Sequence, residues 1–247
     1  LVVGKALETE SDVILWPYIR EQDHKSNKKE VFHTPIIIFH EHEVEEQLYR
    51  RLFGPINNEL RHPENLDALV TACMKLFKSS IVKENSLSFI DTKKIGTEDA
   101  LFNIHYFGYV RKAVYLNEYL YHYRRDNISS LTTKYKPDLL KQWECLFNYM
   151  EAHITANHLG SAFAEALNNR IAMSIIGLGL NALKNNEGKV ESIREIKRII
   201  SIARFRFAYK ELPLRYFPIH WKVFFLFAKL NVASGVYLLL SIIKKLK

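Results

Sequence analysis

The sequence predicts a mixed α/β region followed by a helical one, and three observations support this fold class. The apolar run 12–16 ends at Pro17 and is typical of a buried strand. Residues 114–123 are rich in β-branched and aromatic side chains, which predicts one or two further strands. Beyond Pro137 the chain has long helical patterns and almost no strand signal. We therefore expect strands and helices over residues 1–136 and helices after them.

Two helices and one loop are predicted inside the mixed region. Residues 41–53 have apolar side chains at helical spacing, and this pattern stops at Gly54. Thr97 is suited to cap a second helix over residues 98–109, because two acidic residues follow it in the first turn. The strongly polar residues 21–30 predict a loop.

Composition limits the class of protein. With 247 residues and 48% hydrophobic content the chain can form a packed core, which excludes a wholly disordered protein. Cys73 and Cys145 are too few and too far apart for a disulfide framework, and no Cys-x-x-Cys pair offers a metal site. These features favour a reducing, cytoplasmic setting. The chain begins at Leu1 without a basic and apolar leader, so we expect no secretory signal and either an upstream segment or processing.

The net charge of +8 is concentrated near the C-terminus. Residues 194–247 contain twelve Lys and Arg but two Asp and Glu, a net charge of +10, so the other residues sum to −2. A charge confined to one segment predicts a local anionic partner, either a lipid surface or a nucleic acid. The chain has no recognisable nucleic-acid recognition module, so we expect no nucleic-acid partner.

Two apolar runs in the tail favour an anionic membrane surface as that partner. Residues 223–228 and 236–243 are strongly apolar, but each run is far shorter than the roughly 20 residues that a spanning helix needs. Aromatic residues such as Trp221 and Tyr237 stand among Lys and Arg, which suits a helix lying in the headgroup region. We therefore predict a basic amphipathic membrane-associating tail over residues 213–247. The alternative is that these helices bury their apolar faces in the core or in a dimer contact.

The segment from Gly96 to Phe102 has the sharpest chemical pattern. Glu98 and Asp99 place two carboxylates in the first turn of the predicted helix, where a carboxylate could act as a general base. The helix dipole alone also favours acidic residues there, and Phe102 has the place of a core residue one turn on. The pattern by itself does not separate these two interpretations.

Two other segments suggest ligand contacts. Arg124 and Arg125 end a predicted strand before a Ser-rich turn, and such donors can bind a phosphate. The alternative is an exposed strand end with solvated arginines. The pattern His40-Glu-His-Glu43 invites a metal site, but residues two apart on a helix do not face each other and no third ligand is near in sequence.

Taken in order, these segments resemble the second half of bacterial family 2 glycosyltransferases of capsule and exopolysaccharide clusters. Residues 6–14 are similar to the helix and strand that follow the family's metal-binding Asp-x-Asp motif. Residues 72–78 are similar to the W-x-K-L-Y/F-K stretch beside the acceptor, with Cys73 where that stretch often has Trp.

Two further motifs extend the resemblance over residues 6–135. Residues 98–102 match the family's Glu-Asp base motif, which continues to a Phe. Residues 121–130 match its later Tyr-x-Tyr-Arg-x(4–5)-Ser element. The residues after 137 look like a helical extension found in some members.

The resemblance implies roles for particular residues in an inverting sugar transfer. Asp99 is implied as the base that deprotonates the acceptor hydroxyl, and Glu98 as the residue that orients the site. The implied substrate contacts lie beside the acceptor or near the departing diphosphate: Lys75, Arg124, Arg125 and Ser129. A divalent metal, Mg or Mn, is also implied, with its carboxylate ligands in the Asp-x-Asp motif upstream of Leu1, so no metal ligand is named in this sequence.

The resemblance further implies an incomplete GT-A-like sheet followed by a mainly helical C-terminal region. We expect three parts: an acceptor-side half of a catalytic domain over 1–136, a helical extension over 137–212 and the membrane-associating tail over 213–247. Half a sheet cannot cover itself, so we expect an open edge or an exposed apolar face.

The implied activity is transfer of a sugar from a nucleotide sugar to a glycan or lipid-linked acceptor in cell-surface polysaccharide synthesis. The protein is expected to be peripheral at the inner membrane face, and this chain alone is expected to be inactive. The alternative function is a non-catalytic, membrane-associated interaction module that retains part of the transferase scaffold.

Overall fold

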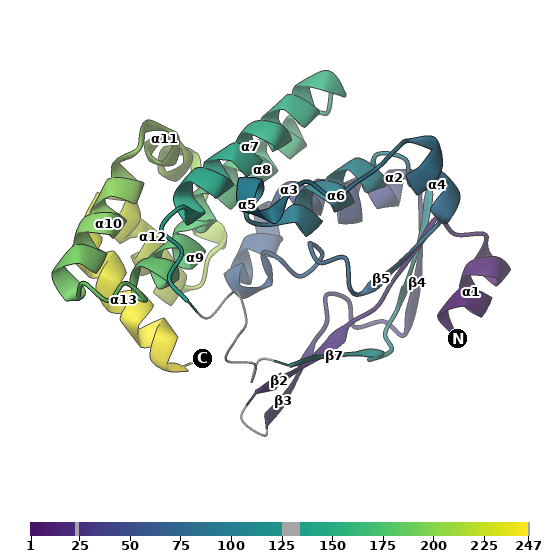
Figure 1. Ribbon diagram of the computed structural model, residues 1–247, viewed down its shortest axis with the longest axis horizontal. Coiled ribbons are helices and arrows are strands. Elements are labelled where there is room, and N and C mark those ends of the chain that lie inside the picture. Colours follow the sequence, from purple (N-terminus) through teal and green to yellow (C-terminus); the bar gives the residue numbers. More distant parts are fainter. Residues whose placement is uncertain (23–24, 125–133, 247) are drawn as a thin grey trace. The chain divides into compact units, whose positions relative to one another are not determined.

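The computed structural model describes residues 1–22, 25–124 and 134–246, and the chain forms two compact units. Unit 1 comprises Leu1–Phe53 and Asn65–Ser130, and unit 2 comprises Gly54–Glu64 and Leu131–Lys247. In Figure 1 the strands lie among the purple to teal elements, and the green and yellow elements are helices. Within the described residues every strand belongs to unit 1, so the predicted α/β region followed by helices is confirmed.

Unit 1 combines two sheets with short helices. Its elements are α1 (Val2–Thr9), β1 (Val13–Leu15), β2 (Tyr18–Gln22), β3 (Lys25–Lys29), β4 (Ile36–His40), α2 (Glu41–Val44), the π-helix η1 (Glu45–Tyr49), α3 (Arg50–Phe53), β5 (Lys75–Phe77), α4 (Ser79–Glu84), α5 (Thr92–Ile95), α6 (Glu98–Phe107), β6 (Lys112–Leu116) and β7 (Tyr121–Arg124). The expected strand 12–16 is therefore β1, and the helices expected over 41–53 and 98–109 form within one or two residues of those bounds.

The larger sheet of unit 1 has the strand order β4-β6-β1-β5. Strand β1 is parallel to β6 and antiparallel to β5, and β4 pairs antiparallel with β6. All three residues of β1 are buried, as expected of a central strand with side chains packed on both faces. Strands β4 and β5 are the two edges, so this sheet is open on both sides.

Helix α6 covers one face of the larger sheet. The Phe77 ring, on edge strand β5, contacts the rings of Phe102 at 5.4 Å and Tyr106 at 4.8 Å between centroids. The Tyr106 hydroxyl donates to the Asp12 carbonyl at 2.6 Å, and the Lys78 N–H donates to that hydroxyl at 2.8 Å. These contacts fix α6 against the β1–β5 pair, and so they also fix the start of α6.

The opposite face of the sheet is covered less completely. Helix α1 packs there on a small buried cluster formed by Ile14, Val114 and Leu116. The cross-strand partners of this cluster on the edge strand β4 are Ile36 and Ile38, which are 41% and 40% exposed. The sheet therefore has the open edge and the partly exposed apolar face that the sequence predicted.

The smaller sheet of unit 1 has the order β3-β2-β7, and it corrects one expectation. The polar residues 21–30 were expected to be a loop, but Lys25–Lys29 form β3, which pairs antiparallel with β2. Backbone hydrogen bonds rather than side-chain burial hold an exposed edge strand, so a lack of apolar residues does not exclude one. The prediction of one or two strands over 114–123 is confirmed by β6 and β7.

Unit 2 is helical throughout its described residues. Its elements are the 3₁₀ helix η2 (Asn57–Arg61), α7 (Leu139–Ala156), α8 (Ser161–Met173), α9 (Ile175–Ala182), α10 (Lys189–Ser201), α11 (Ala203–Glu211), the 3₁₀ helix η4 (Leu214–Tyr216), α12 (Ile219–Lys229) and α13 (Ala233–Leu246), while the 3₁₀ helix η3 (Pro63–Asn65) spans the unit boundary. The sequence predicts separate parts over residues 137–212 and 213–247, whereas both lie in one compact unit.

The C-terminal hairpin α12–α13 shows why the tail belongs to that unit. Phe224 and Phe225 of α12 are fully buried, as are Val236 and Leu240 of α13. Helix α13 packs against α9 and α10, and α12 packs against α11. One side of each apolar run therefore contributes to the core of unit 2, and the other side remains on the surface.

Candidate active site

Asp99 lies in the first turn of α6, with its carboxylate turned to the loop that precedes β5. The Ala72 N–H donates to Asp99 Oδ2 at 3.0 Å. The other oxygen, Oδ1, has no hydrogen-bond partner among the residues that the structure describes. A half-buried carboxylate with one oxygen fixed and the other available is arranged to accept a proton.

Lys75 holds the same loop from the side of β5. Its amino group is buried and donates to the carbonyl of Leu69 at 2.8 Å and to that of Thr71. Burial lowers the pKa of Lys75 to about 7, against a smaller opposing effect of the negative charge of Asp99. Lys75 therefore acts in the folded chain by fixing the 69–72 loop beside Asp99, and a direct contact with an acceptor stays a prediction.

The buried Lys75 leads to a pH-dependent prediction. The folded chain releases this proton near pH 7, while the unfolded chain retains it up to the ordinary value of 10.5. Between these values the unfolded chain holds more protons, so the contribution of Lys75 to stability rises with pH. We expect the urea midpoint of unit 1 to rise between pH 6.5 and 9 by an amount that Lys75→Met removes. An identical pH dependence in the two proteins would contradict the lowered pKa.

Asn103 completes the support of this loop, and the sequence analysis missed it. Its side chain is fully buried, and its Nδ2 donates to the Val70 carbonyl at 2.6 Å and to the Asp99 carbonyl at 2.7 Å. The signal was present in the sequence, because Asn103 is the only amide in the apolar stretch 100–104 of α6, one turn after Asp99.

Tyr121, at the start of β7, lies on the other side of the loop. The pKa of its hydroxyl is raised by burial and by its charge interaction and hydrogen bond with Cys73. Cys73 directly follows Ala72, the residue whose N–H contacts Asp99. Three segments that are far apart in the sequence, around residues 75, 99 and 121, thus meet at one short loop.

Comparison with known proteins identifies the fold. No family model and no curated protein matches the sequence. Among solved structures, the crystal structure of S. aureus TarS 1–349 in complex with UDP-GlcNAc superposes with a TM-score of 0.56 at 12% sequence identity, over 98% of this chain and 62% of that one. The chain has a GT-A-like fold.

The match extends over the α/β unit and the helical unit of this chain. A second structure of S. aureus TarS 1–349 gives a TM-score of 0.47 at 10% identity, over 99% of this chain and 61% of that one. By the first of these matches, the chain spans about three fifths of the length of TarS 1–349. The fold class expected from the sequence, a GT-A-like α/β region followed by a mainly helical region, is confirmed.

Of the four remaining predicted site residues, the structure describes two, Glu98 and Arg124. Glu98 is half-buried beside Asp99 at the start of α6. Arg124 is exposed at the end of β7, and strand alternation places it on the opposite face of the small sheet from Tyr121. Arg125 and Ser129 lie outside the described residues. The roles of these four residues stay predictions.

The metal implied by the GT-A resemblance does not fit the part of the chain that the structure describes. There, no group of three or more His, Cys, Asp and Glu side chains could hold a metal ion. In the pattern His40-Glu-His-Glu43, the Glu43 Oε2 instead accepts the His40 N–H at 3.0 Å and caps α2.

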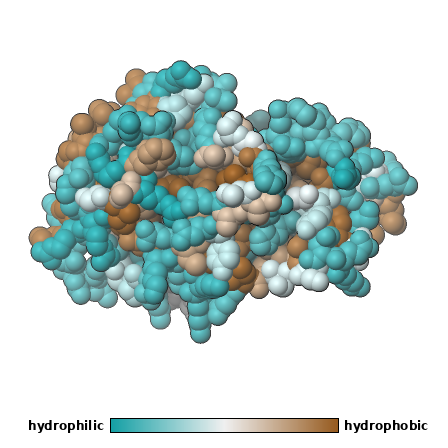
Figure 2. All heavy atoms as spheres, turned by 90° about the horizontal axis from the view of Figure 1, so that it is seen from above, coloured by the Kyte–Doolittle hydropathy of each residue, from teal (hydrophilic) through white to brown (hydrophobic). Residues whose placement is uncertain are grey.

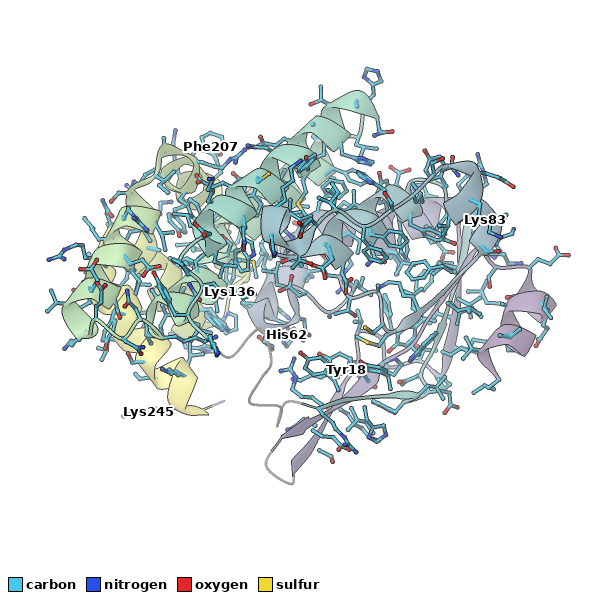
Figure 3. The ribbon with its side chains drawn as sticks, in the orientation of Figure 1. Tyr18, His62, Lys83, Lys136, Phe207 and Lys245 are labelled. Atoms are coloured by element: carbon cyan, nitrogen blue, oxygen red, sulfur yellow. The ribbon has the colours of Figure 1, made fainter. Side chains whose placement is uncertain are left out.

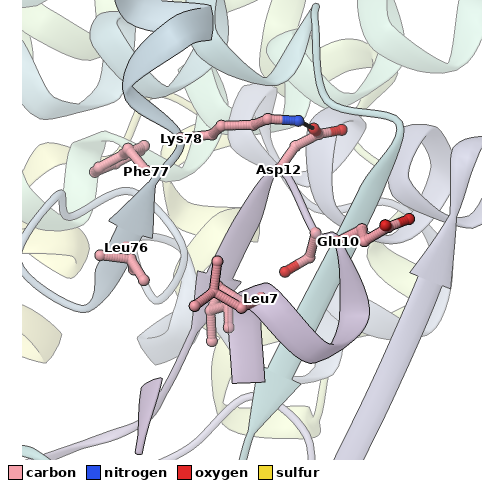
Figure 4. Close-up of a pocket in the computed structure, with 9 residues that line it drawn as sticks. Leu7, Glu10, Asp12, Leu76, Phe77 and Lys78 are labelled. Carbon is pink, nitrogen blue, oxygen red and sulfur yellow. Dashed lines mark hydrogen bonds and ion pairs between the residues drawn. The ribbon is translucent and has the colours of Figure 1, made fainter. Parts of the chain in front are cut away.

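A pocket of about 600 Å³ opens between α1 and the strands β1 and β5, away from Asp99 (Figure 4). Asp12 forms an ion pair with Lys78 there at 3.1 Å. Its carboxylate also accepts hydrogen bonds from the backbone N–H groups of Arg111 and Lys112. These contacts join the ends of β1 and β5 to the start of β6. Because Asp12 and Lys78 already pair with each other, we assign these two residues to the fold rather than to the reaction.

Proposed function

We propose that this chain is the acceptor-side part of an inverting family 2 glycosyltransferase, which moves a sugar from a nucleotide sugar to a glycan or lipid-linked acceptor in cell-surface polysaccharide synthesis. The observation that supports this most is the half-fixed carboxylate of Asp99 beside the loop held by Lys75. The segments that meet there are those that resemble the family's motifs. The GT-A-like fold supports the same class of reaction.

In the proposed reaction Asp99 removes the proton of the acceptor hydroxyl as the oxygen attacks the anomeric carbon. The new C–O bond forms on the face opposite the leaving nucleoside diphosphate, whose bond to the sugar breaks, and the proton remains on Asp99 Oδ1. The Ala72 N–H holds Oδ2 and so keeps the carboxylate oriented during the transfer. Arg124 and Arg125 are proposed to stabilise the charge on the diphosphate.

The donor class is a nucleotide sugar, and UDP-GlcNAc is the first compound to test because the TarS structure contains it. The assay incubates the full-length protein with UDP-sugars and purified surface glycans and measures UDP release. We expect release to rise when a suitable acceptor is added. If no UDP-sugar is consumed with any acceptor, the non-catalytic interaction module becomes the better interpretation.

An anionic membrane surface is proposed as a partner of unit 2. Within the described residues, no helix is long and apolar enough to cross a membrane. Helix α12 nevertheless has an exposed apolar stripe at the spacing of one helix face, opposite the buried Phe224 and Phe225. The stripe consists of Ile219, Val223, Leu226 and Leu230, and its end residues Ile219 and Leu230 are 79% and 62% exposed.

Basic residues surround the C-terminal end of this stripe. Arg206 donates to the Lys229 carbonyl at 2.7 Å, and Lys229 donates to the Lys210 carbonyl at 3.2 Å, so three cations lie where α11 meets α12. Figure 2 shows hydrophobic patches on an otherwise hydrophilic surface, some of them over the C-terminal helices at the left. An apolar stripe beside cations fits a lipid surface with anionic headgroups.

A further inference from the structure

One face of the small sheet presents three tyrosines and one arginine. The parallel pairing of β2 with β7 places Tyr18 opposite Tyr121 and Arg20 opposite Tyr123. Register partners in adjacent strands share a face, and so do residues two apart in one strand. We call these four residues the tyrosine face, and Tyr18 is labelled on it in Figure 3.

The tyrosine face is ordered by contacts among its own side chains. The rings of Tyr18 and Tyr123 pack edge to face, with centroids 6.2 Å apart. Arg20 Nη2 donates to the Tyr18 hydroxyl at 3.0 Å, and its Cζ lies 5.9 Å from the Tyr18 ring centroid. Arg20 Nε is buried and has no hydrogen-bond partner within the described part of the chain. The guanidinium, held by Tyr18, thus has a buried N–H that no described residue satisfies, which is costly.

The tyrosine face is continuous with the candidate active site. Cys73 lies near enough to Tyr121 to raise the pKa of the Tyr121 hydroxyl, and Ala72, which precedes Cys73, donates to Asp99. The other face of the sheet has a different character, because His122 pairs with Glu21 there at 2.7 Å. That face has Glu21 opposite Arg124, whereas the tyrosine face combines aromatic rings with Arg20.

We propose that the tyrosine face binds the acceptor glycan and selects a sugar unit that bears an anionic group, a phosphate or a carboxylate. The C–H groups of a pyranose ring are slightly positive and pack on the negative face of a tyrosine ring. The Arg20 guanidinium donates to the anionic oxygens in a planar, charge-assisted arrangement that an ammonium does not reproduce. The hydroxyl of the neighbouring sugar unit then lies toward Asp99.

This inference rests on the proposed transferase function for the identity of its ligand, but its test measures binding and needs no turnover. Probes are glucose 6-phosphate, glucuronate, glucose and inorganic phosphate, each titrated into the isotope-labelled chain and followed by NMR shifts of the backbone N–H groups of β2 and β7. We expect the two anionic sugars to bind more tightly than either glucose or inorganic phosphate. The two anionic sugars distinguish a phosphate from a carboxylate as the preferred group.

Three variants locate the site. Arg20→Lys keeps the positive charge but loses the planar guanidinium with its paired N–H donors. We expect about ten-fold weaker binding of the anionic sugars with little change for glucose. Tyr123→Leu should weaken binding of all three sugars. The matched control is Lys28→Met, because the register of Lys28 with Ile19 places this exposed cation on the opposite face, and it should leave the affinities within about two-fold. The chemical shifts outside the small sheet show whether each variant is folded.

Several results would overturn the inference. It fails if neither anionic sugar shifts the β2 and β7 signals, if Lys28→Met weakens binding as much as Arg20→Lys, or if inorganic phosphate binds as tightly as glucose 6-phosphate. Failure of the proposed function looks different, because anionic sugars would still bind at Arg20 while no nucleotide sugar is consumed. Conversely, sugar transfer with an unchanged KM for anionic acceptors in Arg20→Lys would contradict acceptor binding by the tyrosine face but not the proposed transferase function.

Discussion

Replacing Asp99 with Asn should reduce the turnover of the full-length protein by about 100-fold or more while leaving its fold and donor affinity nearly unchanged. The amide oxygen of Asn can still accept the Ala72 N–H, so the loop that Lys75 and Asn103 hold keeps its position. The amide cannot accept the acceptor's proton, which removes the chemical step alone. Steady-state rates with saturating donor and acceptor measure the loss.

A matched control is available in the same unit. Asp91 caps α5 by accepting the Lys93 N–H at 2.9 Å, and Asp91→Asn changes the same group at the start of a helix away from the loop. We expect this variant to turn over at the parent rate. Turnover of Asp99→Asn within a few-fold of the parent would remove Asp99 from the role of base. An equal loss in both variants would point to a general effect of charge.

The second large effect is expected on membrane binding through the α12 stripe. Leu226→Asp combined with Leu230→Asp places two charges where we expect acyl chains, and should weaken binding to anionic vesicles by about ten-fold or more. Binding of the parent should weaken with salt but persist, because the apolar contribution is not screened. Co-sedimentation with neutral and anionic vesicles, at low and high salt, measures the electrostatic and the apolar contributions to binding.

Helix α1 supplies the control for this experiment. Val3 and Leu7 have the same i, i+4 spacing as the α12 pair and are 60% and 76% exposed. Val3→Asp combined with Leu7→Asp therefore makes the same chemical change on another exposed helix face and should leave vesicle binding unchanged. A parent protein that stays in the supernatant throughout contradicts the membrane proposal. A parent dimer that the α12 variant dissociates would assign the stripe to a second copy of the chain.

Surface substitutions are needed here because a truncation does not isolate the stripe. Ending the chain before Pro213 deletes the exposed residues together with Phe224, Phe225 and Val236, which are core residues of unit 2. Loss of that core would destabilise the unit by several kcal/mol, so a loss of vesicle binding would have two explanations.

Local patterns in the sequence predicted the elements that are locally determined. Strand β1 follows from a short apolar run that ends at a proline. The start of α6 follows from the two acids behind Thr97, which stands at the N-cap position but makes no side-chain capping hydrogen bond. The position of Asp99 in the first turn follows from the same pattern. Strand β3 was missed because its residues are polar, and only its pairing with β2 makes it a strand.

The arrangement of the site depends on contacts that no local pattern contains. Lys75 is followed by a Leu-Phe-Lys sequence that gives no sign of a buried amino group, and its burial results from the carbonyls of the 69–72 loop closing over it. The tyrosine face depends on the register of β2 with β7, two strands about a hundred residues apart. The sequence motif at residues 121–124 drew attention to Arg124, whereas the register brings Tyr121 and Tyr123 together with Arg20.

The most direct test of inverting sugar transfer is analysis of the glycan product. The full-length protein is incubated with UDP-GlcNAc or another UDP-sugar and an acceptor glycan, and the product is examined by mass spectrometry and NMR. We predict a mass gain of one sugar unit, with the anomeric configuration of the new linkage opposite to that of the donor, and loss of this product in Asp99→Asn. Transfer with retained configuration, or equal product formation without the Asp99 carboxylate, would contradict the account.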